Sequence, residues 1–151
     1  MSDKVVKLLS TWFHVGDIPG APGTMASAVG VVMVLILHPN MFFYVLTFAI
    51  VTVLGFGVSG KMEKILDRKD PSCVVIDEVA GVMLAFFLLP LTPATIVTAF
   101  FLFRAFDMFK IIPVNLFEKL EGSKGIMLDD LTAGAYTNIV MQIAVRWTGI
   151  I

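Results

Sequence analysis

The chain has 151 residues, of which 58% are apolar and 15% are charged, with a formal net charge of −1. Soluble domains typically carry about 45–50% apolar residues, glycine included, and about 25% charged residues. The composition excludes a disordered chain, disfavours an ordinary soluble domain and gives no basis for binding nucleic acid, so we expect a small integral membrane protein.

The first predicted element is a short amphipathic helix near the N-terminus. Val5, Leu8, Leu9 and Trp12 recur there at helical spacing among charged residues. Such a helix fits the membrane surface and fits packing against the rest of the chain equally well. A secretory signal peptide is not expected, because this stretch is charged and lacks a sustained apolar segment.

Three charge-free runs follow, over residues 18–60, 79–103 and 131–145. Runs of about 20 apolar residues are typical of membrane helices. Prolines at 39, 90 and 93 divide the first two runs, because proline interrupts helical hydrogen bonding. The expected helices are therefore Met25–Leu37, Met41–Gly60, Glu78–Leu89, Ala94–Phe109 and Leu131–Arg146.

These helices predict an all-α fold: a compact, membrane-embedded bundle of about six helices, with one domain over residues 1–151. The helix Glu78–Leu89 would rise only about 18 Å, against a hydrocarbon core of roughly 30 Å. It is therefore expected to be re-entrant or buried among its neighbours. A wholly buried helix of a soluble protein is the alternative.

The turns that divide the runs are uncharged, whereas the longer loops carry most of the lysine and arginine. The positive-inside rule places those loops in the cytoplasm. Two helical hairpins would then enter the membrane from the cytoplasmic side and return to it.

Two segments begin charge-free helices with adjacent carboxylates, Asp77-Glu78 and Asp129-Asp130. Each is followed one turn later by Ala-Gly, on the same helix face. Small residues allow two helices to approach closely, so these helix starts could gather up to four carboxylates. Oxygen ligands without a His or Cys cluster favour Mg²⁺. Helix capping by aspartate is the alternative for either pair alone.

A third feature is the spacing of Arg104, Asp107 and Lys110 at three-residue steps, directly after an apolar run. Arginine binds phosphate bidentately and lysine offers a mobile charge, so Arg104 and Lys110 are candidates for a phosphate and Asp107 for a metal. A neutralised surface of ion pairs is the alternative.

The Gly- and Pro-rich loop at residues 16–23 leads into the next helix, with Thr24 as the expected N-cap. Free amides at a helix start can bind an anion, and Thr24 and Ser27 are supporting candidates for phosphate binding. A simple capped loop is the alternative reading of this segment.

Together these segments resemble the phosphatidylglycerophosphatase A family of bacteria. The resemblance rests on four motifs in the family's order, Ala21–Ser27, Asp77–Gly81, Phe103–Lys110 and Gly125–Gly134. The chain departs from the family's usual pattern at three positions, with Ala26 for glycine, Ile111 for proline and Glu118 for aspartate. The role of Glu118 is left open.

The resemblance implies a Mg²⁺-dependent phosphatase of the bacterial cytoplasmic membrane that converts phosphatidylglycerophosphate into phosphatidylglycerol and phosphate, with its site facing the cytoplasm. We expect catalysis to depend on Asp77, Arg104, Asp107, Asp129 and Asp130. We expect Mg²⁺ to be bound by Asp77, Glu78, Asp129 and Asp130, and the phosphate by Thr24, Ser27, Arg104 and Lys110.

Several alternatives stay open from the sequence. The attacking group is either water or an aspartate that becomes phosphorylated. The substrate could be another lipid phosphate, such as a polyprenyl phosphate. A different class of function, a small ion- or proton-coupled membrane transporter, would also place carboxylates among apolar helices. The sequence carries no prediction of oligomeric state.

Overall fold

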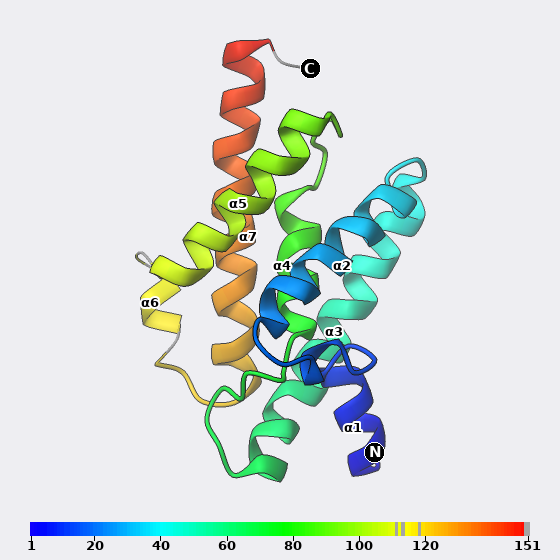
Figure 1. Ribbon diagram of the computed structural model, residues 1–151, viewed down its shortest axis with the longest axis vertical. Helices are drawn as coiled ribbons and strands as arrows, with labels where there is room; N and C mark the ends of the chain where they lie inside the picture. The colour runs from blue at the N-terminus through cyan, green and yellow to red at the C-terminus, as the bar shows by residue number, and fades with distance from the viewer. Residues whose placement is uncertain (111, 113, 118, 150–151) are drawn as a thin grey trace.

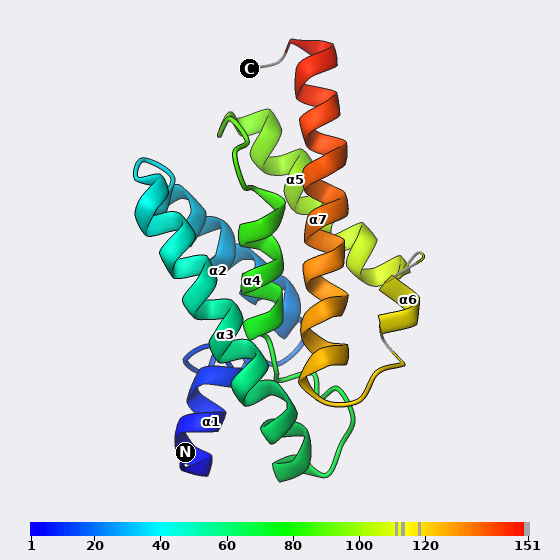
Figure 2. The same cartoon turned by 180° about the vertical axis from the view of Figure 1, so that it is seen from behind.

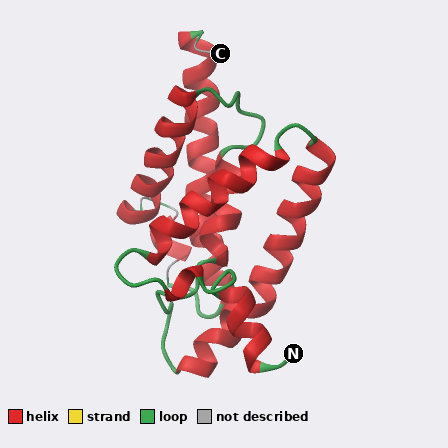
Figure 3. Ribbon diagram, turned by 45° about the vertical axis from the view of Figure 1, so that its right-hand side comes forward, coloured by secondary structure: helices red, strands yellow, loops and turns green. Residues whose placement is uncertain are grey.

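The computed structural model describes residues 1–110, 112, 114–117 and 119–149, so Glu118 lies outside the described part. Within that part every regular element is helical (Figure 3). The elements are α1 (Asp3–Ser10), a 3-10 turn (Val15–Asp17), α2 (Pro22–Leu37), α3 (Met41–Leu66), α4 (Ile76–Ala85), α5 (Pro93–Phe109), α6 (Val114–Phe117) and α7 (Ser123–Thr148). The all-α prediction is confirmed, and the short α6 brings the described α-helices to seven.

The helices form an elongated bundle in which α2–α3 and α4–α5 are hairpins (Figure 1). Both hairpin turns lie at the end of the molecule that holds the C-terminus. The basic loop between α3 and α4 lies at the opposite end, near α1 (Figure 1). The predicted pair of hairpins is therefore present, with the uncharged turns at one end and the charged loop at the other.

Helix α4 occupies the centre of the bundle and contacts α2, α3, α5 and α7. Nine of its ten residues are buried, so it is a core helix rather than a lipid-facing one. Its last carbonyl groups need partners, because a helix end buried without them is unfavourable. Asn138 of α7 donates to the carbonyls of Ala85 and Phe87 (3.1 and 2.7 Å), and Tyr44 donates to that of Met83 (2.6 Å).

Large apolar side chains are exposed along the outside of the bundle, as expected for a protein surrounded by lipid. They include Leu35, Ile36, Phe42, Val53, Phe101, Ile139 and Ile143. Among the described helices, α3 is the one that is long and apolar enough to cross a membrane. The bundle is compatible with a membrane-associated protein.

Helix boundaries differ from the sequence prediction at charged and at uncharged ends, and α4 ends at Ala85 where Leu89 was expected. Helix α3 continues to Leu66 and α7 begins at Ser123, because lysine and glutamate favour helix as well as leucine does. Thr24 is not the N-cap of α2: the helix begins at Pro22, and Ala21 precedes it. Proline suits the first helical position, since its missing N–H would have no partner there.

Candidate active site

Helices α4 and α7 cross at two glycines, and this crossing brings their acidic residues together. A Cβ atom on Gly134 would lie 2.3 Å from the carbonyl oxygen of Gly81, and one on Gly81 would lie 2.7 Å from that of Asp130. Only glycine permits such a close backbone approach. The helices lie next to each other throughout this region (Figures 1 and 2). The acidic residues of both therefore face one shared space.

Three carboxylates form a compact buried group at this end of the bundle. Glu78 of α4, Asp107 of α5 and Asp130 of α7 each place an oxygen within 4.8 Å of the other two. Glu78 and Asp130 are buried, and Asp107 is half-buried. Since three carboxylates this close repel one another, the group needs a cation or protons, and its all-oxygen ligand set could hold a metal ion.

Arg104 provides part of the required positive charge from one side. Its Nη1 atom donates to Glu78 Oε2 (2.7 Å) and to Asp107 Oδ2 (3.0 Å). The Ser27 hydroxyl on α2 donates to the same Glu78 oxygen (3.0 Å). The helix of Gly23 passes so close that a Cβ there would lie 2.6 Å from Glu78 Oε1. Glu78 is thus fixed by residues of α2 and α5 together.

Lys110 provides positive charge from the other side. Its ammonium group donates to Asp129 Oδ2 and lies 3.9 Å from Asp107 Oδ1. Lys110 is also the residue that ends α5, in a left-handed conformation with φ of 47°. Asp129 is accordingly paired with lysine and lies outside the group formed by Glu78, Asp107 and Asp130.

Asp77 and Asp130 lie close together across the helix crossing, and burial together with the charge of Asp77 raises the pKa of Asp130. Two carboxyl groups in such proximity favour a state in which one of them carries a proton. Asp77 Oδ1, Asp129 Oδ1 and Asp130 Oδ2 are buried and have no hydrogen-bond partner in the described structure. These buried acceptors are suited to a cation or to donor groups of a ligand.

Burial raises the pKa of Asp77 and Asp130 well above the usual range, and the nearby Glu78 charge raises both further. Burial also raises the pKa of Glu78 to about 7, although Arg104 and Ser27 act in the opposite direction. Burial lowers the pKa of Lys110, but its contact with Asp129 outweighs this and the net shift is upward. The lysine therefore stays charged, whereas the acids compete for protons or a cation.

These residues line an open cavity of about 490 Å³ at the ends of α2, α4, α5 and α7. Asp77, Glu78, Arg104, Asp107, Lys110, Asp129 and Asp130 all line it, and exposed Thr24 lies at its edge. Ser27 is buried behind Glu78. The sequence had placed Asp129 with the metal and Ser27 with the phosphate, whereas their contacts in the structure are Lys110 and Glu78.

Asp70, which the sequence did not indicate as a site residue, also lines this cavity together with Pro71 and Ser72. These residues belong to the loop between α3 and α4, where no helical spacing draws attention to them. Glu63 of α3 holds the loop in place. Its carboxylate accepts from the backbone N–H of Asp70 (2.9 Å) and of Gly122 (3.0 Å). The sequence feature that could have indicated Asp70 is its position directly before Pro71 and Ser72, where a turn is expected.

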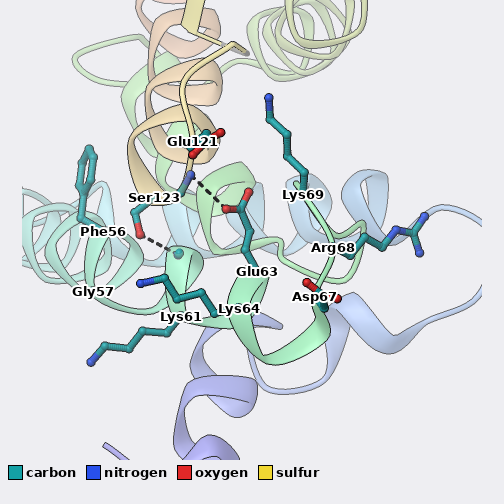
Figure 4. A pocket seen from close by; sticks show the side chains of 12 residues that line it. Phe56, Gly57, Lys61, Glu63, Lys64, Asp67, Arg68, Lys69, Glu121 and Ser123 are labelled. Atoms are coloured by element: carbon teal, nitrogen blue, oxygen red, sulfur yellow. Dashed lines mark hydrogen bonds between the residues drawn. The ribbon is translucent and has the colours of Figure 1, made fainter.

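A separate cavity of about 670 Å³ lies beside the last turns of α3. Figure 4 shows Lys61 and Lys64 directed away from Arg68 and Lys69, while Glu63 points toward the start of α7. Ser123 accepts a hydrogen bond from the Gly60 backbone (2.7 Å). The basic groups diverge and Glu63 is occupied by backbone amides, so this cavity lacks the converging groups of the acidic site.

Comparison with known proteins yields a family match over most of the chain. The sequence model of the family described as phosphatidylglycerophosphatase A matches residues 8–145. A Haemophilus influenzae protein named phosphatidylglycerophosphatase A is 35% identical over 147 residues, covering 94% of this chain and 90% of the relative. An Escherichia coli protein of the same name is 30% identical, covering 93% and 84%.

A third relative carries a different name. A Bacteroides thetaiotaomicron protein named "Putative phosphatidylinositol-3-phosphatase" is 33% identical over 149 residues, covering 93% of this chain and 92% of the relative. No solved structure was found to match the chain. The relatives thus agree on phosphatase activity toward a phospholipid and differ in the headgroup that they name.

Proposed function

The chain belongs to the phosphatidylglycerophosphatase A family, and from this premise we propose that it is a Mg²⁺-dependent phosphatase of phosphatidylglycerophosphate. The products are phosphatidylglycerol and inorganic phosphate. The observation that carries the proposal is the buried group of Glu78, Asp107 and Asp130, bordered by Arg104 and Lys110. Family membership makes the protein a phosphatase; the metal and the residue roles are proposed here.

The site fits Mg²⁺ by its ligand chemistry. Its donors are carboxylate oxygens, and Asp130 contributes a buried oxygen without a partner. Mg²⁺ prefers oxygen ligands and binds through a few carboxylates together with substrate phosphate. Glu78, Asp107 and Asp130 would hold the ion, with Asp77 adjacent. Bound there, it supplies a Lewis acid that offsets negative charge on the phosphoryl oxygens.

The two cations of the site are assigned to the phosphate group. Arg104 and Lys110 each contact a carboxylate from the border of the cavity, so each can also donate to phosphoryl oxygens placed between them. Thr24 lies at the edge, where its hydroxyl can donate as well. Ser27 acts on the substrate only through Glu78, because its hydroxyl already donates to that carboxylate.

In the proposed reaction a water oxygen attacks phosphorus and the bond from phosphorus to the glycerol oxygen breaks. A carboxylate of the site takes a proton from the attacking water. Burial raises the pKa of Asp77 and of Asp130, so a proton held by this pair can pass to the departing glycerol oxygen. An aspartate nucleophile gives the same products in two displacements. Stereochemistry at phosphorus separates them: one displacement inverts it and two retain it.

The proposed location is the bacterial cytoplasmic membrane, with the site facing the cytoplasm. Supporting this, the acidic site lies toward the end of the bundle that carries the basic loop after α3 (Figure 1). Helix α3, which is long enough to span, runs from the opposite end toward this loop. The positive-inside rule then directs the loop and the site to the cytoplasm.

The decisive experiment measures phosphate release by the purified protein from phosphatidylglycerophosphate in detergent micelles. Activity should disappear with a chelator and return with added Mg²⁺, and Asp107→Asn should need a higher Mg²⁺ concentration for half-maximal activity. Full activity in the chelator would overturn the proposed metal dependence. Absence of release under all conditions would overturn the proposed substrate and revive the transport alternative.

A second candidate substrate is phosphatidylinositol 3-phosphate, because one relative of similar identity is named for it. The same assay with this lipid, phosphatidic acid and a polyprenyl phosphate ranks the headgroups by kcat/KM. Equal turnover of all four would indicate a broad lipid phosphatase.

A further inference from the structure

A set of exposed apolar side chains lies on both sides of Lys110 in the sequence, and one of them, Met108, lines the catalytic cavity. Met108, Phe109, Ile112, Leu116 and Leu120 are 69%, 79%, 72%, 51% and 40% exposed. They come from the end of α5 and from the segment through α6, and we call them the collar. Large apolar groups clustered beside a site indicate a binding surface for an apolar partner.

The collar is held in place by the fold. The left-handed conformation of Lys110 ends α5 and turns the chain away from the helix axis. Tyr136 of α7 then donates a hydrogen bond to the carbonyl of Ile112 (2.6 Å). Helix α6 consequently stands at the side of the bundle next to α7 (Figures 1 and 2).

The collar is continuous with the site. Met108 lines the catalytic cavity. Leu120 lines a neighbouring cavity that includes Lys119 and shares Asp129 and Asp70 with the catalytic one. An apolar surface with a lysine at its edge, open toward a phosphate site, complements a phospholipid, whose anionic headgroup adjoins apolar chains.

We propose that the collar receives the acyl-chain end of the phospholipid substrate, so that the lipid enters the catalytic cavity from the side of α5 and α6. This inference rests on the proposed function. The phosphate reaches Arg104 and Lys110 while the chains remain against the collar and the surrounding bilayer. The collar is thus a determinant of lipid substrate affinity that takes no part in the chemistry.

The test compares two phenylalanines of the same helix. Phe109 belongs to the collar, and Phe101, at 65% exposure, lies two turns earlier on α5 and serves as the control. Kinetics of Phe109→Ser, Leu116→Ser and Phe101→Ser are measured with long-chain phosphatidylglycerophosphate in vesicles and with a water-soluble dibutyryl analogue. Removing one large apolar contact should raise KM for the long-chain lipid at least about fivefold, with kcat unchanged.

The expected result is that only the two collar variants lose affinity, and only for the long-chain substrate. Equal effects on both substrates, or an equal effect of Phe101→Ser, would overturn the inference. A change in oligomeric state on Phe109→Ser, measured by light scattering, would instead assign the collar to contact between copies of the chain. Failure of the wild type to hydrolyse either substrate would refute the proposed function, which is a separate outcome.

Discussion

Helices α4 and α7 carry nearly the same sequence pattern, two acidic residues followed by Ala-Gly, at the first turn of α4 and two turns into α7, yet their carboxylates have different partners. Aligned on the crossing glycines, Asp77 and Asp130 are equivalent, because each precedes its glycine by four residues. These two lie close together across the crossing, and burial raises the pKa of both. The remaining acids differ: Glu78 contacts Arg104 and Ser27, whereas Asp129 contacts Lys110.

The comparison shows that a helix crossing determines which carboxylates meet, and that neighbouring helices determine what the others do. The extra acid follows the central aspartate in α4 and precedes it in α7. The two extra acids therefore project in different directions, one toward Arg104 and the other toward Lys110. The repeated motif thus supplies a central pair of aspartates and two outer carboxylates, each of which forms an ion pair with a basic side chain.

The largest loss of kcat is expected when the two aspartates of the central pair, Asp77 and Asp130, are replaced one at a time. Asp130 also belongs to the group with Glu78 and Asp107, whereas Asp77 does not. Asp130→Asn should therefore lower kcat by about 10³-fold, and Asp77→Asn by about 10²-fold. Phosphate release and thermal unfolding of both variants check this. A larger loss in Asp77→Asn would reverse the assignment.

The next largest effect should come from the crossing itself. In Gly134→Ala the added Cβ would lie 2.3 Å from the Gly81 carbonyl, so the helices must separate. Overpacking of this kind costs about 1–3 kcal/mol of stability, and displacing the carboxylates by about 1 Å should lower kcat roughly 10²-fold. Gly57→Ala is the matched control, because its Cβ meets no atom within 4 Å. Similar losses in both variants would contradict the role of the crossing.

A moderate effect is expected from the ion pair of Asp129 and Lys110. Asp129→Asn and Lys110→Gln should each lower kcat/KM by about 10–100-fold, and the double variant should be little worse than either, because contacting residues act together. The Mg²⁺ concentration for half-maximal activity should rise in Asp107→Asn and stay unchanged in Asp129→Asn. Weaker Mg²⁺ activation in Asp129→Asn would make Asp129 a metal ligand instead.

The smallest effect should come from Ser27→Ala. Burial raises the pKa of Glu78 to about 7, and the hydrogen bond from Ser27 lowers it. If ionised Glu78 is required, activity increases as pH rises through this pKa, and losing the hydrogen bond should move the rise to higher pH by about half a unit. The pH profile of kcat/KM at fixed Mg²⁺ measures it. A shift toward lower pH would contradict the assigned contact.

Apolar runs and turn residues predicted most of the architecture. The uncharged turns around Pro39 and Pro90 divide the hairpins as expected, and the shortness of the Glu78 helix indicated its buried position. Boundaries were missed where helices continue into charged residues, as in α3 from Lys61 to Leu66. Charge marks the edge of the apolar region rather than the end of a helix.

The sequence predicted most of the residues that form the site, but not which of them contact one another. Helical spacing placed Asp77 and Asp130 on the faces that carry Gly81 and Gly134. It could not show that Lys110 adopts a left-handed conformation and reaches Asp129, because that contact depends on how α5 ends against α7. Asp70 was missed for a similar reason, since a loop held by Glu63 leaves no periodic pattern.

The length of α3 has a mechanical consequence in the proposed orientation. Its 26 residues extend about 39 Å, roughly 9 Å more than the hydrocarbon core of a bilayer. The final turns reach into water and carry, through Glu63, the loop that borders the catalytic cavity. The length of the helix therefore sets the distance of the site carboxylates from the bilayer. Bilayer thickness becomes a variable of the reaction, and a thicker membrane would draw the site closer to the headgroups.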